Sequence, residues 1–177
     1  ESWEIADRDD GMSVVTNGPL AGKTLRQLMQ AMPAALLGMS GEDTFPLLIK
    51  IIDAAKPLSI QVHPDEATSE KYGGEAKTEM WYVLDADEGA SVYAGLVPKA
   101  TPESFRVALN DDALAPILQH TQVEAGDVIF VPGGRVHAIG AGCLLLEVQQ
   151  NSNTTYRVYD WGRLGHDGRP RELHIDK

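Results

Sequence analysis

Short runs of alternating apolar and polar residues recur along this 177-residue chain, separated by turns that contain Gly or Pro. This spacing is typical of many short strands joined by tight turns, which fold as a β-sandwich or a β-barrel. The run 46–53 is nearly continuously apolar apart from Lys50, as expected for a strand covered on both faces. We expect further strands at 1–5, 14–16, 58–62, 80–84 and 90–94, on either side of a tight turn at 126–127, and at 136–138, 143–149 and 154–158.

Helical signals interrupt this pattern. Thr24 is a good N-cap for an amphipathic run that extends to residue 32, and a short helix is expected to follow at 34–37. Thr101-Pro102-Glu103 supplies an N-cap, an N1 proline and a first-turn acid, which begin a helical insertion that continues in pieces to residue 118. The sequence therefore predicts a mainly β fold with helical segments near 24–37 and 101–118 outside the sheets, and a smaller helical patch at 66–71.

Length, composition and charge exclude several classes of protein. With 43% hydrophobic and 23% charged residues, the chain fits one globular domain of ordinary size. No apolar run approaches the roughly 20 residues of a membrane span and no leader opens the chain, so we expect a cytoplasmic protein. The net charge of −11 argues against nucleic acid and anionic membranes as partners, and an anionic substrate would need a local basic pocket. The single cysteine, Cys143, lies in an apolar run and is interpreted as a core residue.

Both ends of the sequence look like the interior of a longer chain. The first residue is Glu1 rather than Met, and 1–5 already resembles the inside of a strand. Residues 172–175 resemble the start of another element. We therefore expect residues 1–177 to be a fragment.

One stretch, 58–65, combines strand patterning with chemistry. Its alternation places Gln61 and His63 on the same face, two residues apart, before Pro64 ends the run. Two potential metal ligands therefore lie on one face of the strand. The same spacing also fits a buried, hydrogen-bonded histidine with no further role.

Glu79, at the start of an apolar strand, and His137, after a glycine turn, extend this pair. Imidazole, carboxylate and amide oxygen together suit a divalent cation such as Zn²⁺. The other histidines lack such strand settings and are interpreted as solvated or structural: His120, His166 and His174.

Four motifs, in this order and at these separations, resemble the type I mannose-6-phosphate isomerases. They are L-S-I-Q-V-H-P-D (58–65), K-T-E-M-W-Y (77–82), V-P-G-G-R-V-H-A (131–138) and E-V-Q-Q-N-S-N-T-T-Y-R-V-Y-D (147–160). The resemblance implies a cupin-type β-barrel or jelly roll with one zinc ion, and residues 1–177 would form a single catalytic cupin domain. It also implies that His63, Glu79 and His137 bind the zinc, with Gln61 as the fourth ligand. The resemblance covers the family's catalytic cupin and does not extend to its extreme N-terminus or its second, C-terminal cupin.

The implied reaction interconverts D-mannose 6-phosphate and D-fructose 6-phosphate by proton transfer through a cis-enediol. Arg157 matches the family's catalytic arginine and is expected to stabilise an enediolate oxygen, although an isolated arginine there could equally be exposed on a strand. For the proton carrier we expect Glu147, because burial at the end of an apolar strand raises a carboxyl pKa. The alternative is a structural carboxylate paired with Lys77 or Arg157.

The basic pocket that a sugar phosphate requires is less defined. Lys50 and Ser59 correspond to family pocket positions, and Lys77 and Arg163 extend the basic set, Lys77 as a further candidate catalytic residue. Lys50 could instead direct its ammonium to solvent, and Ser59 could be an ordinary strand hydroxyl. The family's opening strand borders the active site, but Trp3 beside Glu1 fits a core position as well.

Two other functions remain open at this point. One is a non-catalytic cupin module that binds a sugar phosphate, and the other is an iron-dependent cupin oxygenase with the same ligands. As an isomerase, the protein is expected to act on a small-molecule sugar phosphate as a monomer or weak homodimer.

Overall fold

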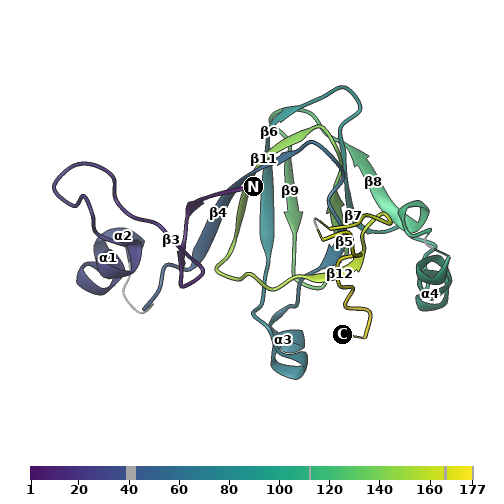
Figure 1. The fold of residues 1–177 in the computed structure, drawn as a ribbon, viewed down its shortest axis with the longest axis horizontal. Coiled ribbons are helices and arrows are strands. Elements are labelled where there is room, and N and C mark those ends of the chain that lie inside the picture. The colour runs from purple at the N-terminus through teal and green to yellow at the C-terminus, as the bar shows by residue number, and fades with distance from the viewer. Residues whose placement is uncertain (39–42, 112, 166, 177) are drawn as a thin grey trace.

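Two five-stranded antiparallel sheets face each other and enclose the core (Figure 1). The computed structural model describes residues 1–38, 43–111, 113–165 and 167–176. The first sheet has the order β1 (Ser2–Ile5), β4 (Leu47–Ala54), β11 (Cys143–Gln150), β6 (Glu79–Ala86), β9 (Val128–Val131). The second has the order β12 (Tyr156–Tyr159), β5 (Ile60–Val62), β10 (His137–Ile139), β7 (Ser91–Leu96), β8 (Leu118–Gln122).

This arrangement is a mainly β, cupin-type jelly roll, as the sequence predicted. Alternation in the strands produces it, because every second side chain points between the sheets. In β4, Leu48 and Ile52 are buried while Ile49 and Ile51 on the opposite face are half-buried, so only one face of this strand is fully covered. The core between the sheets includes Trp81, which is fully buried.

The predicted helices form with the expected caps. In α1 (Leu25–Ala31), Thr24 and Gln27 form a capping box, and α2 (Pro33–Leu37) ends at Gly38 in the left-handed conformation. The helix α3 (Glu66–Tyr72) begins at Asp65, and the insertion after Thr101 consists of α4 (Pro102–Asn110) and a 3₁₀ turn (Ala115–Ile117). Ala108 of α4 packs on the outer face of the second sheet. Within the described ranges, none of the helices is both long and apolar enough to span a bilayer.

The predictions of a strand at 14–16 and of a new element starting at 172–175 were wrong. The segment 14–16 makes one isolated bridge, Val14 to Thr24, and β2 (Asp7–Arg8) and β3 (Gly11–Met12) form a small hairpin before it. The turn predicted at 126–127 is present between two strands, and these strands pair in different sheets, β8 with β7 and β9 with β6. The turn therefore lets the chain cross between sheets. Residues 172–175 begin no strand or helix.

Candidate active site

Two rows of polar side chains face each other between the sheets. In the second sheet, Gln61 lies opposite both Arg157 of β12 and His137 of β10 in the strand register. In the first sheet, Glu147 lies opposite both Lys50 of β4 and Trp81 of β6. Strand pairing thus brings together residues that are far apart in the sequence.

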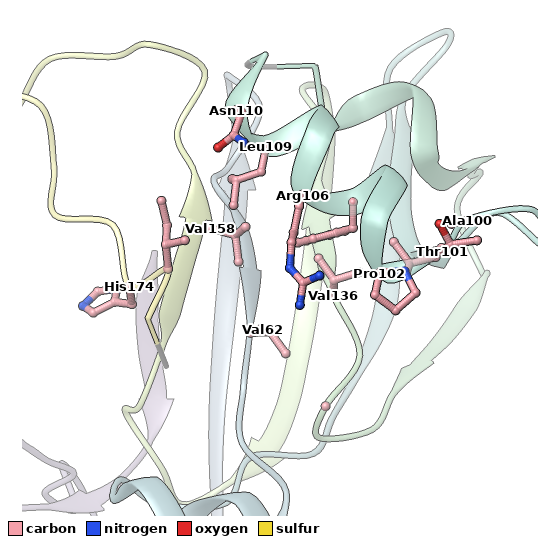
Figure 2. A pocket seen from close by; sticks show the side chains of 14 residues that line it. Val62, Ala100, Thr101, Pro102, Arg106, Leu109, Asn110, Val136, Val158 and His174 are labelled. Atoms are coloured by element: carbon pink, nitrogen blue, oxygen red, sulfur yellow. The ribbon is translucent and has the colours of Figure 1, made fainter.

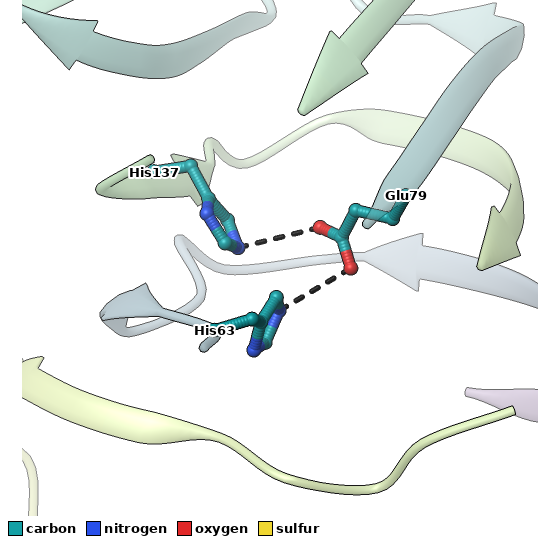
Figure 3. A group of neighbouring side chains, drawn as sticks. All are labelled: His63, Glu79 and His137. Atoms are coloured by element: carbon teal, nitrogen blue, oxygen red, sulfur yellow. Dashed lines mark ion pairs between the residues drawn. The ribbon is translucent and has the colours of Figure 1, made fainter. Parts of the chain in front are cut away.

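Three buried side chains meet where these rows approach each other (Figure 3). His63 Nε2 lies 3.2 Å from Glu79 Oε2, and His137 Nε2 lies 3.3 Å from Glu79 Oε1. All three residues are about 1% exposed. Glu79 comes from the first sheet, His137 from the second, and His63 directly follows β5 of the second sheet. The predicted residues are therefore brought together across both sheets.

The protonation pattern of this triad fits a cation. His63 Nδ1 lies 3.0 Å from the Thr154 carbonyl and His137 Nδ1 lies 2.8 Å from the Arg135 carbonyl, so each Nδ1 carries the proton and donates. Each Nε2 then presents a lone pair to an oxygen of Glu79. Among the described residues, His63 Nε2 and both Glu79 oxygens are buried without a hydrogen bond of acceptable geometry.

The charges agree with this pattern. Burial lowers the pKa of His63 to about 4 and lowers that of His137, so both imidazoles are neutral at pH 7. Burial alone would raise the pKa of Glu79, but the ammonium of Lys77, 3.4 Å from its Oε2, helps to keep it below the ordinary value, so the carboxylate is ionised. Two neutral imidazoles and one carboxylate form a donor set for a borderline divalent cation such as Zn²⁺.

Gln61 lies beside this donor set. Its amide Nε2 is 3.3 Å from His137 Nε2, and its Oε1 is 3.3 Å from Ser59 Oγ. A half turn of the amide would direct the oxygen toward the triad. Gln61 is therefore placed where a fourth ligand could act.

A close backbone contact joins two of the ligand-bearing segments. A Cβ at Gly133 would lie 2.8 Å from both the Pro64 carbonyl oxygen and Asp65 Cα. The next residue, Gly134, has φ of 82° and donates from its N–H to the His63 carbonyl at 2.7 Å. The two glycines thus let the segment before His137 lie against the segment after His63.

A cavity of about 310 Å³ opens beside the triad. Its lining contains six of the residues singled out from the sequence: Lys50, Ser59, Gln61, Lys77, Glu147 and Arg157. Lys77 reaches the triad itself, because its Nζ lies 3.4 Å from Glu79 Oε2. The cavity therefore brings the expected catalytic residues Glu147, Arg157 and Lys77 together beside the donor set.

Glu147 is buried and held from two sides. Its Oε1 is 3.3 Å from Lys50 Nζ, and its Oε2 accepts a hydrogen bond from Trp81 Nε1 at 3.1 Å. Burial, and then the charge of Glu79, raise its pKa, while Lys77 and Lys50 oppose the rise. The cation that pairs with Glu147 is therefore Lys50, and not Lys77 or Arg157 as the structural alternative assumed. The Lys50 ammonium does not extend into solvent. Lys50 is buried, and the ring of Trp3 lies over its Nζ with the ring centroid 5.4 Å away.

Arg157 is anchored by the C-terminal segment. Its backbone N–H donates to His174 Nδ1 and its carbonyl accepts from the His174 N–H. Its Nη1 donates to the Glu172 carbonyl at 3.1 Å, while its buried Nε lacks a partner among the described residues. His174 thus has the structural role expected for it, and His120 is exposed beside Tyr93. His166 lies outside the described residues.

The structure does not bring Arg163 into the cavity lining. Its Nη1 donates to the Pro57 carbonyl and its Nη2 pairs with Asp160. Arg171 occupies the lining instead and pairs with the same carboxylate. Sequence reasoning missed Arg171 because no motif or strand pattern marks it.

A second cavity, of about 680 Å³, lies under α4 on the other side of the second sheet (Figure 2). Val62 and Val158 line it from the strands, and Leu109 and Arg106 line it from α4. Alternation places these valines on the strand face opposite to Gln61 and Arg157. Despite its size, this cavity is therefore separate from the candidate active site.

Comparisons with known proteins agree with this geometry. The profile of the family described as "Phosphomannose isomerase type I, catalytic domain" matches residues 1–105. Mannose-6-phosphate isomerase from Streptococcus mutans is 46% identical over the whole chain, and mannose-6-phosphate isomerase ManA from Bacillus subtilis is 42% identical. The chain spans 56% of the length of each of these relatives.

Solved structures show the same fold. The crystal structure of mannose 6-phosphate isomerase from Bacillus subtilis superposes with a TM-score of 0.88 at 40% identity, covering 98% of this chain and 55% of that one. A more distant neighbour, described as a mannose 6-phosphate isomerase bound with zinc and yttrium, has a TM-score of 0.59 at 18% identity, with 88% of this chain and 60% of that one covered, and shares the fold alone. The chain therefore belongs to the type I phosphomannose isomerase catalytic-domain family.

Proposed function

We propose that this chain carries the active site of an aldose–ketose isomerase that interconverts D-mannose 6-phosphate and D-fructose 6-phosphate. The observation that carries the proposal is one cavity whose lining joins a buried carboxylate, Glu147, to an arginine, Arg157, beside a His/Glu/His donor set. A bare metal-binding module does not require the first two groups. Family membership supports the same reaction, which the relatives' names assign to chains of nearly twice this length.

We propose zinc as the cofactor, held by His63, Glu79 and His137 with Gln61 as the fourth ligand. The neutral imidazoles and the ionised carboxylate support this choice, as does the zinc described in one structural neighbour. When bound, such an ion supplies Lewis-acid polarisation of oxygen.

Glu147 is the proposed proton carrier. Its carboxylate takes the proton from C2 of open-chain mannose 6-phosphate, the C–H electron pair forms the C1–C2 double bond, and the π pair of the C1 carbonyl moves onto O1. The O2 proton is transferred to O1. The O2 lone pair then forms the C2 carbonyl of fructose 6-phosphate as the C1–C2 π pair takes the proton from Glu147 at C1. A raised pKa suits this work because a base is most effective when its pKa lies near the working pH. Trp81 and Lys50 hold the carboxylate in place, which keeps one orientation available to the substrate.

The remaining cavity groups are proposed to stabilise negative charge on the substrate and on the enediolate. Arg157 stabilises the enediolate oxygen through its fixed charge and does not exchange protons. Lys77, next to Glu79, adds positive charge on the same wall. Lys50 and Ser59 remain proposed substrate contacts at the lining, and Arg163 would need to leave its partners to join them.

A coupled assay for fructose 6-phosphate, combined with anaerobic metal analysis of the same sample, tests this function. Zinc with turnover is the expected result. Zinc without turnover would indicate a sugar-phosphate-binding module, and iron with oxygen consumption would indicate an oxygenase.

We further propose that residues 1–177 act as one catalytic cupin domain in the cytoplasm. The basic groups Lys50, Lys77, Arg157 and Arg171 in the cavity lining support a small-molecule sugar phosphate as the partner. The strongly negative net charge argues against nucleic acid and an anionic membrane. We propose a monomer or weak homodimer. Size-exclusion chromatography with light scattering tests the oligomeric state.

A further inference from the structure

Arg171 is a cationic group at the cavity that neither the motifs nor the proton-transfer chemistry accounts for. It lines the cavity together with Arg157, although it lies fourteen positions later and outside any strand or helix. Its side chain is 43% exposed, so the guanidinium is at the solvent side of the cavity.

A buried carboxylate orients this arginine. Arg171 Nε donates to Asp160 Oδ2 at 2.7 Å and its Nη2 donates to Asp160 Oδ1, which makes the pair bidentate. Asp160 is only 5% exposed and is also paired with Arg163. Burial alone would raise the pKa of Asp160, but Arg171 and Arg163 keep it lowered. The carboxylate therefore stays ionised and holds Arg171 at the cavity.

The arginines outnumber the carboxylates at this end of the cavity. Asp160 is shared by two arginines, while Arg157 donates to a backbone carbonyl and has a buried Nε without a partner among the described residues. The pKa of Arg157 is lowered first by burial and then by the positive charge of Arg171. Two guanidinium groups close enough to repel each other, in a chain of net charge −11, favour an anion between or beside them.

The deeper cations of the lining are already neutralised. Lys50 pairs with Glu147 and Lys77 pairs with Glu79, and both ammonium groups are nearly buried. A phosphate dianion placed there would lose its hydration and compete with two carboxylates. At the solvent side, it would keep part of its hydration and meet the guanidinium N–H groups of Arg171 that do not donate to Asp160.

We propose that Arg171 is the principal phosphate-binding residue of this site, with Asp160 as its positioning residue, and that it selects phosphorylated over unphosphorylated sugars. The inference rests on the proposed function, since it names the group that recognises that substrate's phosphate. It moves this role from Lys50 and Arg163 to a residue of the C-terminal segment.

Calorimetric titration of the metal-loaded protein with fructose 6-phosphate, and separately with inorganic phosphate, tests the proposal without turnover. Loss of a charge-assisted contact should weaken both ligands about tenfold in Arg171→Ala, with partial recovery in Arg171→Lys. Arg169→Ala is the matched control, because it removes the same charge from an exposed neighbour outside the cavity lining. Unchanged melting temperature and zinc content would show that Arg171→Ala remains folded.

Kinetics separate this inference from the proposed function. In Arg171→Ala, KM for mannose 6-phosphate should rise about tenfold while kcat changes little, and kcat/KM for unphosphorylated mannose should stay unchanged. Wild-type affinity for both anions in Arg171→Ala overturns the inference even if the wild type isomerises its substrate. Arg171-dependent phosphate binding by a wild type that does not isomerise supports the inference and overturns the function instead.

Discussion

Replacing Lys50 with methionine removes one half of the buried ion pair between β4 and β11. Lys50 Nζ lies 3.3 Å from Glu147 Oε1, and both side chains are 5% exposed. At an effective dielectric constant of about 20, this separation corresponds to roughly 5 kcal/mol of attraction. Removing one member of a buried pair costs about 3–5 kcal/mol, because the other charge stays buried without compensation. We therefore expect the free energy of unfolding at pH 7 to fall by about 3 kcal/mol, or the melting temperature by roughly 6–12 °C.

The pH dependence of this loss follows from Glu147. Burial raises its pKa in the folded protein above the ordinary value of a glutamate, so the folded state disfavours its ionised form, and Lys50 limits that rise. In Lys50→Met the pKa rises further. The destabilisation relative to the wild type should therefore grow as pH rises from the folded-state pKa of Glu147 in the wild type to its higher folded-state pKa in the variant, and should be smaller below both, where Glu147 is protonated in both folded proteins. The acid limb of kcat should move to higher pH, because the base must be ionised.

A double-mutant cycle measured by urea denaturation gives the interaction free energy between Lys50 and Glu147. The double variant Lys50→Met/Glu147→Gln should be more stable than the sum of the two single effects predicts, because no charge remains buried. Additivity within about 0.5 kcal/mol would refute the reasoning and mean that Lys50 does not stabilise Glu147. Kinetically, Lys50→Met should lower kcat more than it raises KM. The opposite pattern would favour the phosphate contact expected from the sequence.

Three further predictions concern the metal site. Zinc at about 100 times its Kd should raise the melting temperature by roughly 5–10 °C in a calorimetric scan. His63→Ala should abolish this rise. An equal rise in His63→Ala would show that the metal binds at another site. Gln61→Ala should weaken zinc binding in a competitive chelator titration without abolishing it. Complete loss of zinc binding would show that Gln61 is as necessary for it as the two histidines. Gly133→Ala should lower the free energy of unfolding by about 1–3 kcal/mol in chemical denaturation, since the added Cβ would lie 2.8 Å from the Pro64–Asp65 backbone. An unchanged free energy of unfolding would show that the backbone can move apart at this contact without cost.

Local patterns predicted most strands and all the helices of this fold. The capping residues Thr24 and Thr101 marked helix starts correctly, because a cap depends only on neighbouring residues. Pairing between distant strands was harder to predict. The turn at 124–127 has the composition of a hairpin, yet its strands pair in different sheets, and nothing local distinguishes the two outcomes.

The same distinction holds in the site. The four motifs identified the residues that the structure gathers around the His/Glu/His set. They did not indicate that Lys50 and Trp81 hold Glu147, because that depends on the register of three strands. Nor did they indicate Arg171, whose place depends on Asp160 and on how the C-terminal segment lies beside β12.

Solvent-tritium exchange at C2 of the substrate tests the central claim most directly, because it reports proton transfer at the carbon. The zinc-loaded wild-type protein should incorporate tritium from water while forming fructose 6-phosphate. Glu147→Gln keeps the shape of the side chain but removes the base, so it should bind the substrate and fail to exchange. Exchange at the wild-type rate in Glu147→Gln would contradict the role of Glu147, and a zinc-loaded wild type that neither exchanges nor isomerises would contradict the proposed reaction.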